Sequence, residues 1–306
     1  MRIAVTGASG QVGFELVRSL MPLGDVVALD RAGCDLEDPV AVARTIRACG
    51  ADVIVNAAAY TAVDRAEREE TLATRINGEA PGALARIARE TRALLIHYST
   101  DYVFDGGKRG AWAEGDLVAP LNAYGRSKLA GERAVAASGC DHLILRTSWV
   151  FAARGGNFVT TMLRLGAERE SLGVVGDQVG APTWARNIAD ATGHLIVRAL
   201  VERDQDRFRS EILHLSSQGE TSWHGFAEAI FDEARRHLPR RLLRVSEVAA
   251  IPTSAYPTAA ARPANSLLDC TRLDVRYGIR MPHWRQALVR CLQEMNQEPG
   301  SRDSIA

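Results

Sequence analysis

The sequence predicts an α/β protein built on a doubly wound parallel sheet, with a smaller α+β lobe toward the C-terminus. In residues 1–150, short runs of β-branched and apolar residues alternate with longer segments of helical periodicity. Residues 151–306 lack this regular alternation and contain a proline-punctuated stretch, with Pro252, Pro257 and Pro263. We therefore expect one domain over residues 1–150 and a lobe formed mainly by 151–306. A segment of about 174–214 is expected to return to the first domain.

Five short apolar runs are the expected strands of the sheet: residues 3–6, 26–29, 53–55, 94–97 and 143–145. Nearly continuous apolar strands that alternate with helices indicate a parallel sheet covered on both faces, because the connecting helices must pack against it. In the second half we expect helices over 184–200, 223–237 and 284–295, and a strand over 212–215.

The composition excludes several classes of partner. The 306 residues contain 37 Lys plus Arg and 37 Asp plus Glu, so no overall positive field attracts a nucleic acid or an anionic membrane. No uncharged apolar stretch approaches the ~20 residues that a membrane helix needs. The first strand-like run follows the two N-terminal residues and leaves no room for a secretion signal, so we expect a cytoplasmic protein.

The five cysteines are widely spaced and odd in number, which predicts neither disulfides nor a zinc site.

A glycine-rich turn lies directly after the first predicted strand. Within it, Gly7 permits a tight turn, Gly10 lets backbone amides approach a pyrophosphate, and Gly13 lets the next helix sit close to the strand. Gln11 and Val12 begin that helix, whose N-terminus would face the anion. The turn predicts a Rossmann-type dinucleotide-binding domain, although the same glycines also suit an ordinary strand-to-helix turn.

The ends of the next two predicted strands supply further candidates for cofactor binding. Asp30 follows the glycines by about 20 residues, where a carboxylate can hold ribose hydroxyls and favours NADH. Arg31 could instead pair with a 2′-phosphate and favour NADPH, so we expect both cofactors to bind. Asp35 and Leu36 either meet the adenine or form a solvated acidic loop. The third strand ends in small side chains that suit a flat ligand: Ala57, Ala58 and Ala59.

Tyr124 and Lys128 are spaced i, i+4 in a helical segment, so both point from one face. A nearby ammonium favours the ionised form of a tyrosine, so Lys128 is expected to lower the pKa of Tyr124. The fourth strand ends in a run of hydroxyl side chains, where Ser99 or Thr100 can donate to a carbonyl oxygen. A held nicotinamide, an oxygen donor and a proton source are the three parts that hydride transfer to a ketone requires.

Seven stretches carry a wider resemblance: residues 7–13, 56–64, 99–104, 120–132, 146–150, 177–183 and 262–266. Together they resemble the extended short-chain dehydrogenase/reductase family over nearly the full length of the chain. The resemblance implies reduction, by NADPH or NADH, of the C4 ketone of a dTDP-linked deoxysugar, dTDP-4-dehydro-β-L-rhamnose. It also implies that Thr100 hydrogen-bonds the ketone, that Tyr124 donates the proton, and that Lys128 binds the nicotinamide ribose and supports the tyrosine.

The same resemblance implies a substrate site. Besides Thr100 and Tyr124, the residues expected to line the sugar pocket are Val63, Asp101, Tyr102 and Trp149. The indole face suits the apolar side of a deoxysugar, and the alternative for Trp149 is an ordinary core position. Arg262 and Asn265 either bind the nucleotide diphosphate or belong to a solvated loop.

Some members of the family bind Mg²⁺ at a dimer interface through acidic side chains. Glu15 matches one of these acids, but Arg186 stands where another is expected, so we do not expect a metal site. A guanidinium beside Glu15 could form an ion pair instead. If the protein forms a homodimer, it would then rest mainly on apolar contacts.

Other functions share parts of this pattern. A nonenzymatic regulatory subunit of the same fold would not need Thr100, Tyr124 and Lys128, all of which are present. A nucleotide-sugar epimerase or dehydratase uses its bound NAD⁺ catalytically and generally needs further acid/base groups. A related reductase that makes a different deoxysugar would look the same at this level. Stoichiometric consumption of the cofactor separates a reductase from a regulatory subunit and from an enzyme that recycles its bound NAD⁺.

Overall fold

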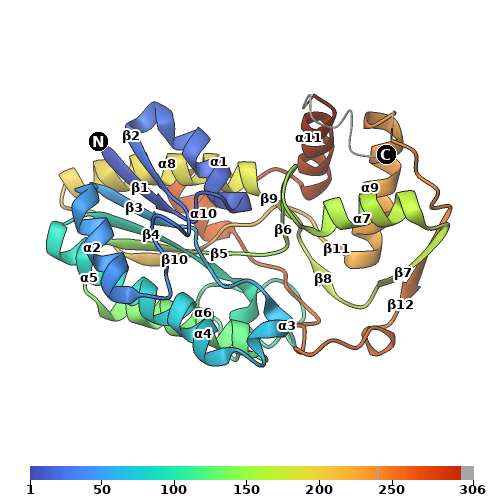
Figure 1. Cartoon of the computed structure of the whole chain (residues 1–306), viewed down its shortest axis with the longest axis horizontal. Helices are drawn as coiled ribbons and strands as arrows, with labels where there is room; N and C mark the ends of the chain where they lie inside the picture. The colour runs from blue at the N-terminus through green and yellow to red at the C-terminus, as the bar shows by residue number, and fades with distance from the viewer. Residues whose placement is uncertain (240, 298–306) are drawn as a thin grey trace.

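The computed structural model of the chain describes residues 1–239 and 241–297, which form a sheet domain and a smaller lobe (Figure 1). The strands of the sheet are β1 (Arg2–Thr6), β2 (Asp25–Leu29), β3 (Val53–Asn56), β4 (Leu94–Thr100), β5 (His142–Thr147) and β10 (Glu211–His214). They lie in the order β10-β5-β4-β3-β1-β2, and each neighbouring pair is parallel. The predicted doubly wound parallel sheet is confirmed.

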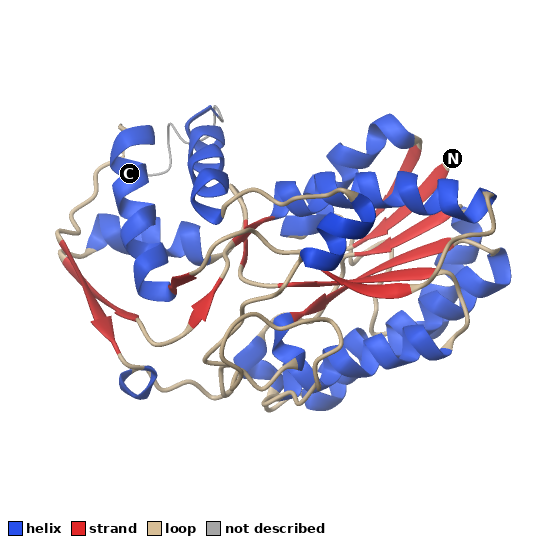
Figure 2. Cartoon of the chain, turned by 180° about the vertical axis from the view of Figure 1, so that it is seen from behind, coloured by secondary structure: helices blue, strands red, loops and turns tan. Residues whose placement is uncertain are grey.

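Successive residues of the strands point to opposite faces of the sheet, and each face has its own helices (Figure 2). Ile3 and Val5 are fully buried against α1 and α8, whereas Ala4 is buried with Ile54 against α2 and α5. The helices of the sheet domain are α1 (Gln11–Leu20), α2 (Pro39–Cys49), α3 (Val63–Ala66), α4 (Glu70–Thr74), α5 (Ala80–Thr91), α6 (Ala123–Ala137), α8 (Ala185–Asp204) and α10 (Thr271–Tyr277). Burial on both faces explains why the strands read as nearly continuous apolar runs.

The order of the strands creates a crevice at one edge of the sheet. From β1 the chain passes to β2 on one side, and it then returns to β3 on the other side of β1. The helices that leave β1 and β3 therefore diverge, and ligands of open α/β sheets bind at such a reversal, beyond the carboxyl ends of the strands.

The lobe is held together by aromatic and aliphatic side chains between its three long helices. Its elements are β6 (Val150–Phe151), α7 (Phe158–Glu168), β7 (Ser171–Val175), β8 (Val179–Gly180), β9 (Thr183–Trp184), β11 (Thr221–Ser222), α9 (Trp223–His237), β12 (Glu247–Ile251) and α11 (Trp284–Gln297). Phe151, Phe226 and Leu288 are fully buried in its core. The strands form three short pairs, β7 with β12, β8 with β11, and β6 with β9.

Two segments from the second half of the chain belong to the sheet domain. α8 packs against α1, and β10 extends the sheet beside β5. Before α8, the strands β7, β8 and β9 pair with other strands of the lobe. α10 also returns, since Leu273 and Tyr277 are buried in the same cluster as the sheet.

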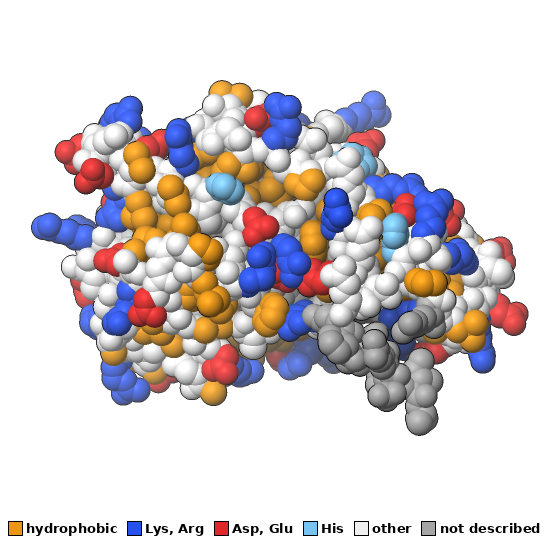
Figure 3. Space-filling view, turned by 90° about the horizontal axis from the view of Figure 1, so that it is seen from above, with side chains coloured by type: hydrophobic (Ala, Val, Ile, Leu, Met, Phe, Trp, Pro, Cys, Tyr) orange, Lys and Arg blue, Asp and Glu red, His pale blue; other side chains and the backbone are white. Residues whose placement is uncertain are grey.

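The surface carries mixed charge. In the view of Figure 3, which looks onto the side that carries α1 and α8, basic and acidic side chains are interspersed with apolar ones. All five cysteines are free thiols within the described residues, and Cys34, Cys140 and Cys291 are buried. Among the helices described, none combines the length and apolar character required to cross a bilayer.

Candidate active site

A cleft of about 580 Å³ opens at the crevice predicted by the strand order. Twelve of the predicted cofactor residues line it: Gly7, Gly10, Gln11, Val12, Arg31, Asp35, Leu36, Ala57, Ala58, Ala59, Tyr124 and Lys128. Further lining residues were not singled out for cofactor binding in the sequence: Ser9, Cys34, Tyr60, Thr61, Ile76, Tyr98, Thr147, Val150, Gly155 and Gly156. The glycine turn and the catalytic candidates of α6 therefore share one cavity.

The glycine turn is shaped by close backbone contacts. Gly7 has a φ of 69°, and a Cβ there would lie 2.7 Å from the backbone of Ala58. A Cβ at Gly13 would overlap the carbonyl of Gly7, so α1 begins directly against the turn. Among the described residues, no side chain caps the N-terminus of α1. Its first amide groups therefore remain available to an anion.

The two charged residues after β2 have different surroundings. Arg31 lines the cleft and forms ion pairs with Glu37 and, at 3.7 Å, with Asp35. Asp30 is absent from the described lining, and its Oδ1 accepts a hydrogen bond of 2.9 Å from the amide of Gly33. The contact between Asp30 and a ribose thus stays a prediction, because in this structure the carboxylate holds the turn that follows β2.

The helix α6 brings its tyrosine and lysine to the cleft. Asn122 precedes the helix, and its Oδ1 accepts a hydrogen bond of 2.8 Å from the amide of Gly125. Tyr124 lies in the first turn, and Lys128 follows one turn later with 3% of its surface exposed. The Nζ of Lys128 donates to the carbonyl of Tyr98 at 2.7 Å, which ties α6 to β4.

Burial dominates the acid/base properties of this pair. It raises the pKa of Tyr124 to about 12, against the smaller opposite effect of a hydrogen bond with Thr100. It lowers the pKa of Lys128 to about 8, although nearby Glu132 acts in the other direction. The predicted lowering by Lys128 is thus not seen in this structure, where the pKa of Tyr124 is raised and burial is the largest cause of the shift. The phenol is fully protonated near neutral pH.

Three predicted substrate residues form a cluster with Tyr124 at the end of β4. The Thr100 hydroxyl donates to Asp101 Oδ1 at 3.0 Å and accepts from the amide of Tyr102 at 3.2 Å. Asp101 is 3% exposed, and burial raises its pKa to about 6. The ring of Tyr102 meets the ring of Tyr124 edge to face, with centroids 5.5 Å apart. The hydroxyl of Thr100 thus lies within hydrogen-bonding reach of the phenol.

A buried amide that the sequence analysis missed connects α6 to the loop after β3. Asn77 lies in a π-helical turn (Arg75–Glu79) and is 1% exposed. Its Oδ1 accepts from the amide of Tyr60 at 2.8 Å, and its Nδ2 donates to the carbonyl of Tyr60 and to Ser127 Oγ at 3.0 and 2.9 Å. Ser127 in turn donates to the carbonyl of Tyr124 at 2.7 Å. Asn77 therefore fixes both walls of the cleft.

Arg262 and Asn265 are held by protein groups in this structure. The guanidinium of Arg262 pairs with both carboxylate oxygens of Asp64, at 3.0 and 2.7 Å. The Nδ2 of Asn265 donates to the carbonyls of Lys108 and Gly110 at 2.8 and 2.7 Å. Neither residue lies in a freely solvated loop. Contacts of Arg262 and Asn265 with the diphosphate stay predictions, and each would require the side chain to give up the hydrogen bonds described here.

The remaining predicted substrate residues, Val63 and Trp149, are not among the described residues that line the cleft. Val63 begins α3, next to the residue that pairs with Arg262, and is partly buried. Trp149 follows β5 and is also partly buried. It lies in the chain between Thr147 and Val150, which both line the cleft.

The cleft contains buried polar atoms that lack partners among the described residues: Gln11 Oε1, Ser99 Oγ and Thr147 Oγ1. Each belongs to a residue of the lining. Because buried polar groups are normally hydrogen-bonded, these atoms indicate a polar ligand. A dinucleotide, with its diphosphate, ribose hydroxyls and carboxamide, fits this lining together with the open amides of α1.

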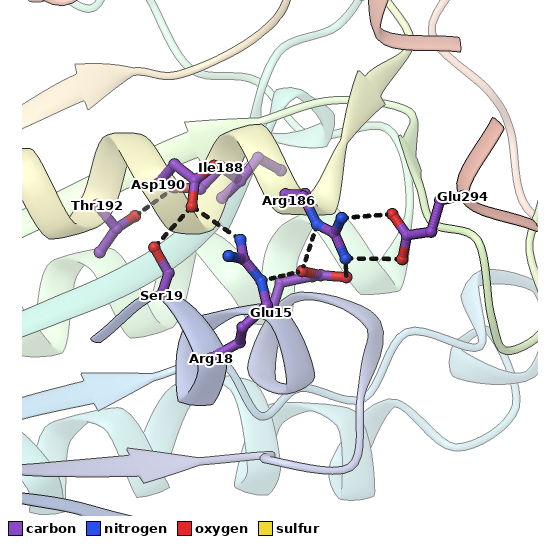
Figure 4. A network of polar contacts seen from close by, with 8 residues as sticks. All are labelled: Glu15, Arg18, Ser19, Arg186, Ile188, Asp190, Thr192 and Glu294. Carbon is purple, nitrogen blue, oxygen red and sulfur yellow. Dashed lines mark hydrogen bonds and ion pairs between the residues drawn. The ribbon is translucent and has the colours of Figure 1, made fainter. Parts of the chain in front are cut away.

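Glu15 and Arg186 form the expected ion pair, within a larger network (Figure 4). The Nε of Arg186 donates to Glu15 Oε2 at 2.9 Å, and its Nη2 donates to Glu294 Oε1 at 2.7 Å. Arg18 donates to the same oxygen of Glu15 at 3.0 Å. The pair is mostly withdrawn from solvent, because the side chains of Arg186 and Glu15 are 27% and 1% accessible. Arg186 thus joins α1 of the sheet domain to α11 of the lobe.

Comparisons with known proteins agree with this architecture. Residues 1–297 match the family described as RmlD substrate binding domain. The dTDP-4-dehydrorhamnose reductase of Burkholderia thailandensis is 53% identical over 96% of this chain and 99% of its own length. The enzyme of that name from Salmonella typhimurium is 47% identical, over 96% and 98%. The crystal structure of dTDP-4-dehydrorhamnose reductase from Bacillus anthracis in complex with NADP superposes with a TM-score of 0.85, at 34% identity, and covers 96% of this chain and 99% of that one.

Proposed function

The chain belongs to the RmlD substrate binding domain family, and on that premise we propose that it reduces dTDP-4-dehydro-β-L-rhamnose to dTDP-L-rhamnose with NADPH or NADH. Relatives that match 96% of the chain bear the name of this reaction, and one related crystal structure contains NADP. The observation that carries the proposal is the cluster of Thr100, Tyr124 and Lys128 beside the cleft.

The residues assigned to the cofactor divide into three groups. The glycine turn and the first amides of α1 would hold its diphosphate. Arg31 would meet a 2′-phosphate, and Lys128 would bind the nicotinamide ribose. The small side chains at 57–59 line the cleft and would leave room there for a flat group of the cofactor. When bound, the reduced nicotinamide supplies a hydride to the ketone carbon.

The side chains of the cluster then act on the ketone oxygen. Negative charge develops there as the carbonyl is reduced, and the Thr100 hydroxyl donates a hydrogen bond that stabilises it. Tyr124 transfers its phenolic proton to this oxygen, which completes the alcohol. A pKa of about 12 suits this task, because the phenol carries its proton at neutral pH. The ammonium of Lys128 stabilises the phenolate that remains.

A direct assay tests this function. The protein is mixed with dTDP-4-dehydrorhamnose and NADPH, the loss of cofactor absorbance is followed, and the product sugar is identified. One NADPH should be consumed for each sugar, which neither a regulatory subunit nor an epimerase would do. A different deoxysugar as product would assign the chain to a related reductase.

Tyr124→Phe tests the proton donor. We expect turnover to fall by about 10²-fold or more, the scale of general acid catalysis, while the fold and cofactor binding remain. Binding of NADPH, measured by fluorescence, serves as the control for an intact cleft. Turnover close to that of the wild type would refute the assignment of Tyr124.

A further inference from the structure

A loop of the lobe, residues 152–157, reaches the cleft beside the start of α1. The loop connects β6 to α7, and its residues Gly155 and Gly156 both line the cleft. A Cβ at Gly155 would lie 3.7 Å from the Cγ of Gln11, the first residue of α1. The cleft is therefore bounded by a segment of the lobe as well as by the glycine turn of the sheet domain.

Asn157 gives this loop a fixed shape. Its Nδ2 donates to the carbonyls of Ala152, Arg154 and Gly155, at 2.9, 3.3 and 3.4 Å. Its Oδ1 accepts from the amide of Thr160 at 3.1 Å, and the Thr160 hydroxyl bonds back to the amide of Asn157 at 3.1 Å. This capping box begins α7. The loop is thus held in shape by the protein itself.

Arg154 ties the loop to α1. Its guanidinium lies over the ring of Phe14, 3.8 Å from the ring centroid. A cation in this position is attracted by the negative face of the ring. Phe14 belongs to the first turn of α1, and its amide donates to the carbonyl of Gly10 at 2.9 Å. The contact therefore places a positive charge beside the helix N-terminus whose amides remain available to an anion.

The loop also offers hydrogen-bond donors of its own. Among the described residues, the amides of Gly155 and Gly156 have no protein acceptor. Gly155 has a φ of 72°, and consecutive amides at a turn of this kind form a concavity that suits an anion. The buried Oε1 of Gln11, next to Gly155, likewise lacks a partner in the described part of the chain, which indicates a polar ligand here.

We propose that the loop 152–157 forms the second half of the site for the cofactor diphosphate. The amides of Gly155 and Gly156 bind its oxygens, and Arg154, held on Phe14, pins the loop to α1 and adds a positive charge. The inference rests on the proposed function, in which NADPH occupies the cleft. Because the glycine turn belongs to the sheet domain and the loop to the lobe, the bound diphosphate bridges the two parts of the protein.

Binding of NADPH to two glycine variants tests the loop. A Cβ at Gly156 would meet no protein atom within 4 Å, so G156V should fold normally while it places a branched side chain at the wall of the cleft. We expect the Kd of NADPH, measured by fluorescence, to rise about tenfold or more, the scale of one hydrogen bond to a charged group. G115V is the matched control, because Gly115 is equally open and lies outside the described lining of the cleft. Its Kd should equal that of the wild type.

Variants of the contact between Arg154 and Phe14 test the pin. R154M and F14L should each raise the Kd of NADPH about two- to fivefold, the scale of an exposed cation–π contact. If the two side chains act as one unit, R154M/F14L should bind NADPH as R154M does. A Kd within about twofold of the wild-type value in both G156V and R154M would overturn the proposal.

Two fragments of the cofactor locate the effect. ADP-ribose contains the diphosphate, whereas adenosine 2′-monophosphate does not. In calorimetry, G156V should weaken binding of ADP-ribose as strongly as binding of NADPH, and it should leave binding of adenosine 2′-monophosphate unchanged. Equal losses for both fragments would contradict a diphosphate site in the loop. If the wild type binds no NADPH, the proposed function itself fails; if it binds NADPH and reduces the sugar while G156V and R154M retain wild-type affinity, only this inference fails.

Discussion

Arg186 is the shared counter-ion of the carboxylates of Glu15 and Glu294. The substitution R186Q removes its positive charge and leaves a neutral amide that can still donate hydrogen bonds. The side chains of Glu15, Arg186 and Glu294 are 1%, 27% and 16% exposed, so the attraction is less screened than in a surface pair. Removing one partner of a buried pair costs about 3–5 kcal/mol. Arg18 still donates to Glu15 at 3.0 Å, so we expect a smaller loss in the free energy of unfolding, roughly 2–3 kcal/mol.

Thermal unfolding of R186Q and of a matched control measures this loss. R164Q removes the same charge from an exposed i, i+4 pair on α7, whose side chains are 60% and 51% accessible, and should cost less than about 1 kcal/mol. At about 2–4 °C per kcal/mol for a chain of this class, R186Q should lower Tm by roughly 4–12 °C. Equal shifts in R186Q and R164Q would refute the argument from burial.

The same variant tests the relation to metal. We expect wild-type activity to survive exhaustive chelation, because a guanidinium occupies the position between the two carboxylates and offers no lone pair to a cation. In R186Q the carboxylates are left facing each other, so Mg²⁺ should recover part of the lost stability. Loss of wild-type activity on chelation, restored specifically by Mg²⁺, would overturn this reasoning.

Three further predictions concern the cleft. Lys128→Ala should weaken both NADPH binding and turnover, because one ammonium serves both tasks, and a change confined to stability would contradict its placement. NADH and NADPH should both support reduction, with kcat/KM values within ~10-fold or about 1.4 kcal/mol, and R31A should lower only the NADPH value. Burial raises the pKa of the Asp101 carboxyl from 3.8 to about 6. Between these two pH values the folded protein keeps the Asp101 proton, whereas the unfolded chain releases it. The free energy of unfolding therefore decreases as the pH rises from about 4 to 6. The free energy of unfolding of the wild type, relative to that of D101N, should therefore fall by roughly 2–3 kcal/mol between pH 4 and pH 7. Denaturant titrations of both proteins measure it, and a difference between them that does not change with pH would refute the burial of the carboxyl.

The sheet and the glycine turn could be predicted because their signals are local. Apolar runs of three or four residues were enough to locate the strands of the sheet. The steric need for Gly7 and Gly13 follows from a turn between adjacent elements. The i, i+4 spacing of Tyr124 and Lys128 likewise needs only a helix to bring both to one side. These features depend little on contacts between residues that are far apart in the sequence.

The rest of the site depends on tertiary packing. Asn77 reaches Ser127 across 50 positions, and Arg262 reaches Asp64 across 198, so neither partner is visible in a local pattern. The raised pKa of Tyr124 follows from its burial, which cannot be inferred from the i, i+4 spacing of Tyr124 and Lys128. One signal was available for Asn77: it stands just before a helix whose first nine residues are mostly small or apolar, and a buried amide at such a position requires partners.

The interleaving of the two parts along the chain has a consequence for synthesis on the ribosome. The edge strand β10 and the covering helix α8 lie in sequence beyond the first half of the lobe, and α10 lies beyond α9. A nascent chain that has released β1 to β5 therefore exposes the apolar edge of β5 and the face that α8 later covers. At about 5–20 residues per second, several seconds pass before β10 emerges. During that interval the unfinished sheet presents a strand edge to other chains, which makes this the stage at which aggregation competes with folding.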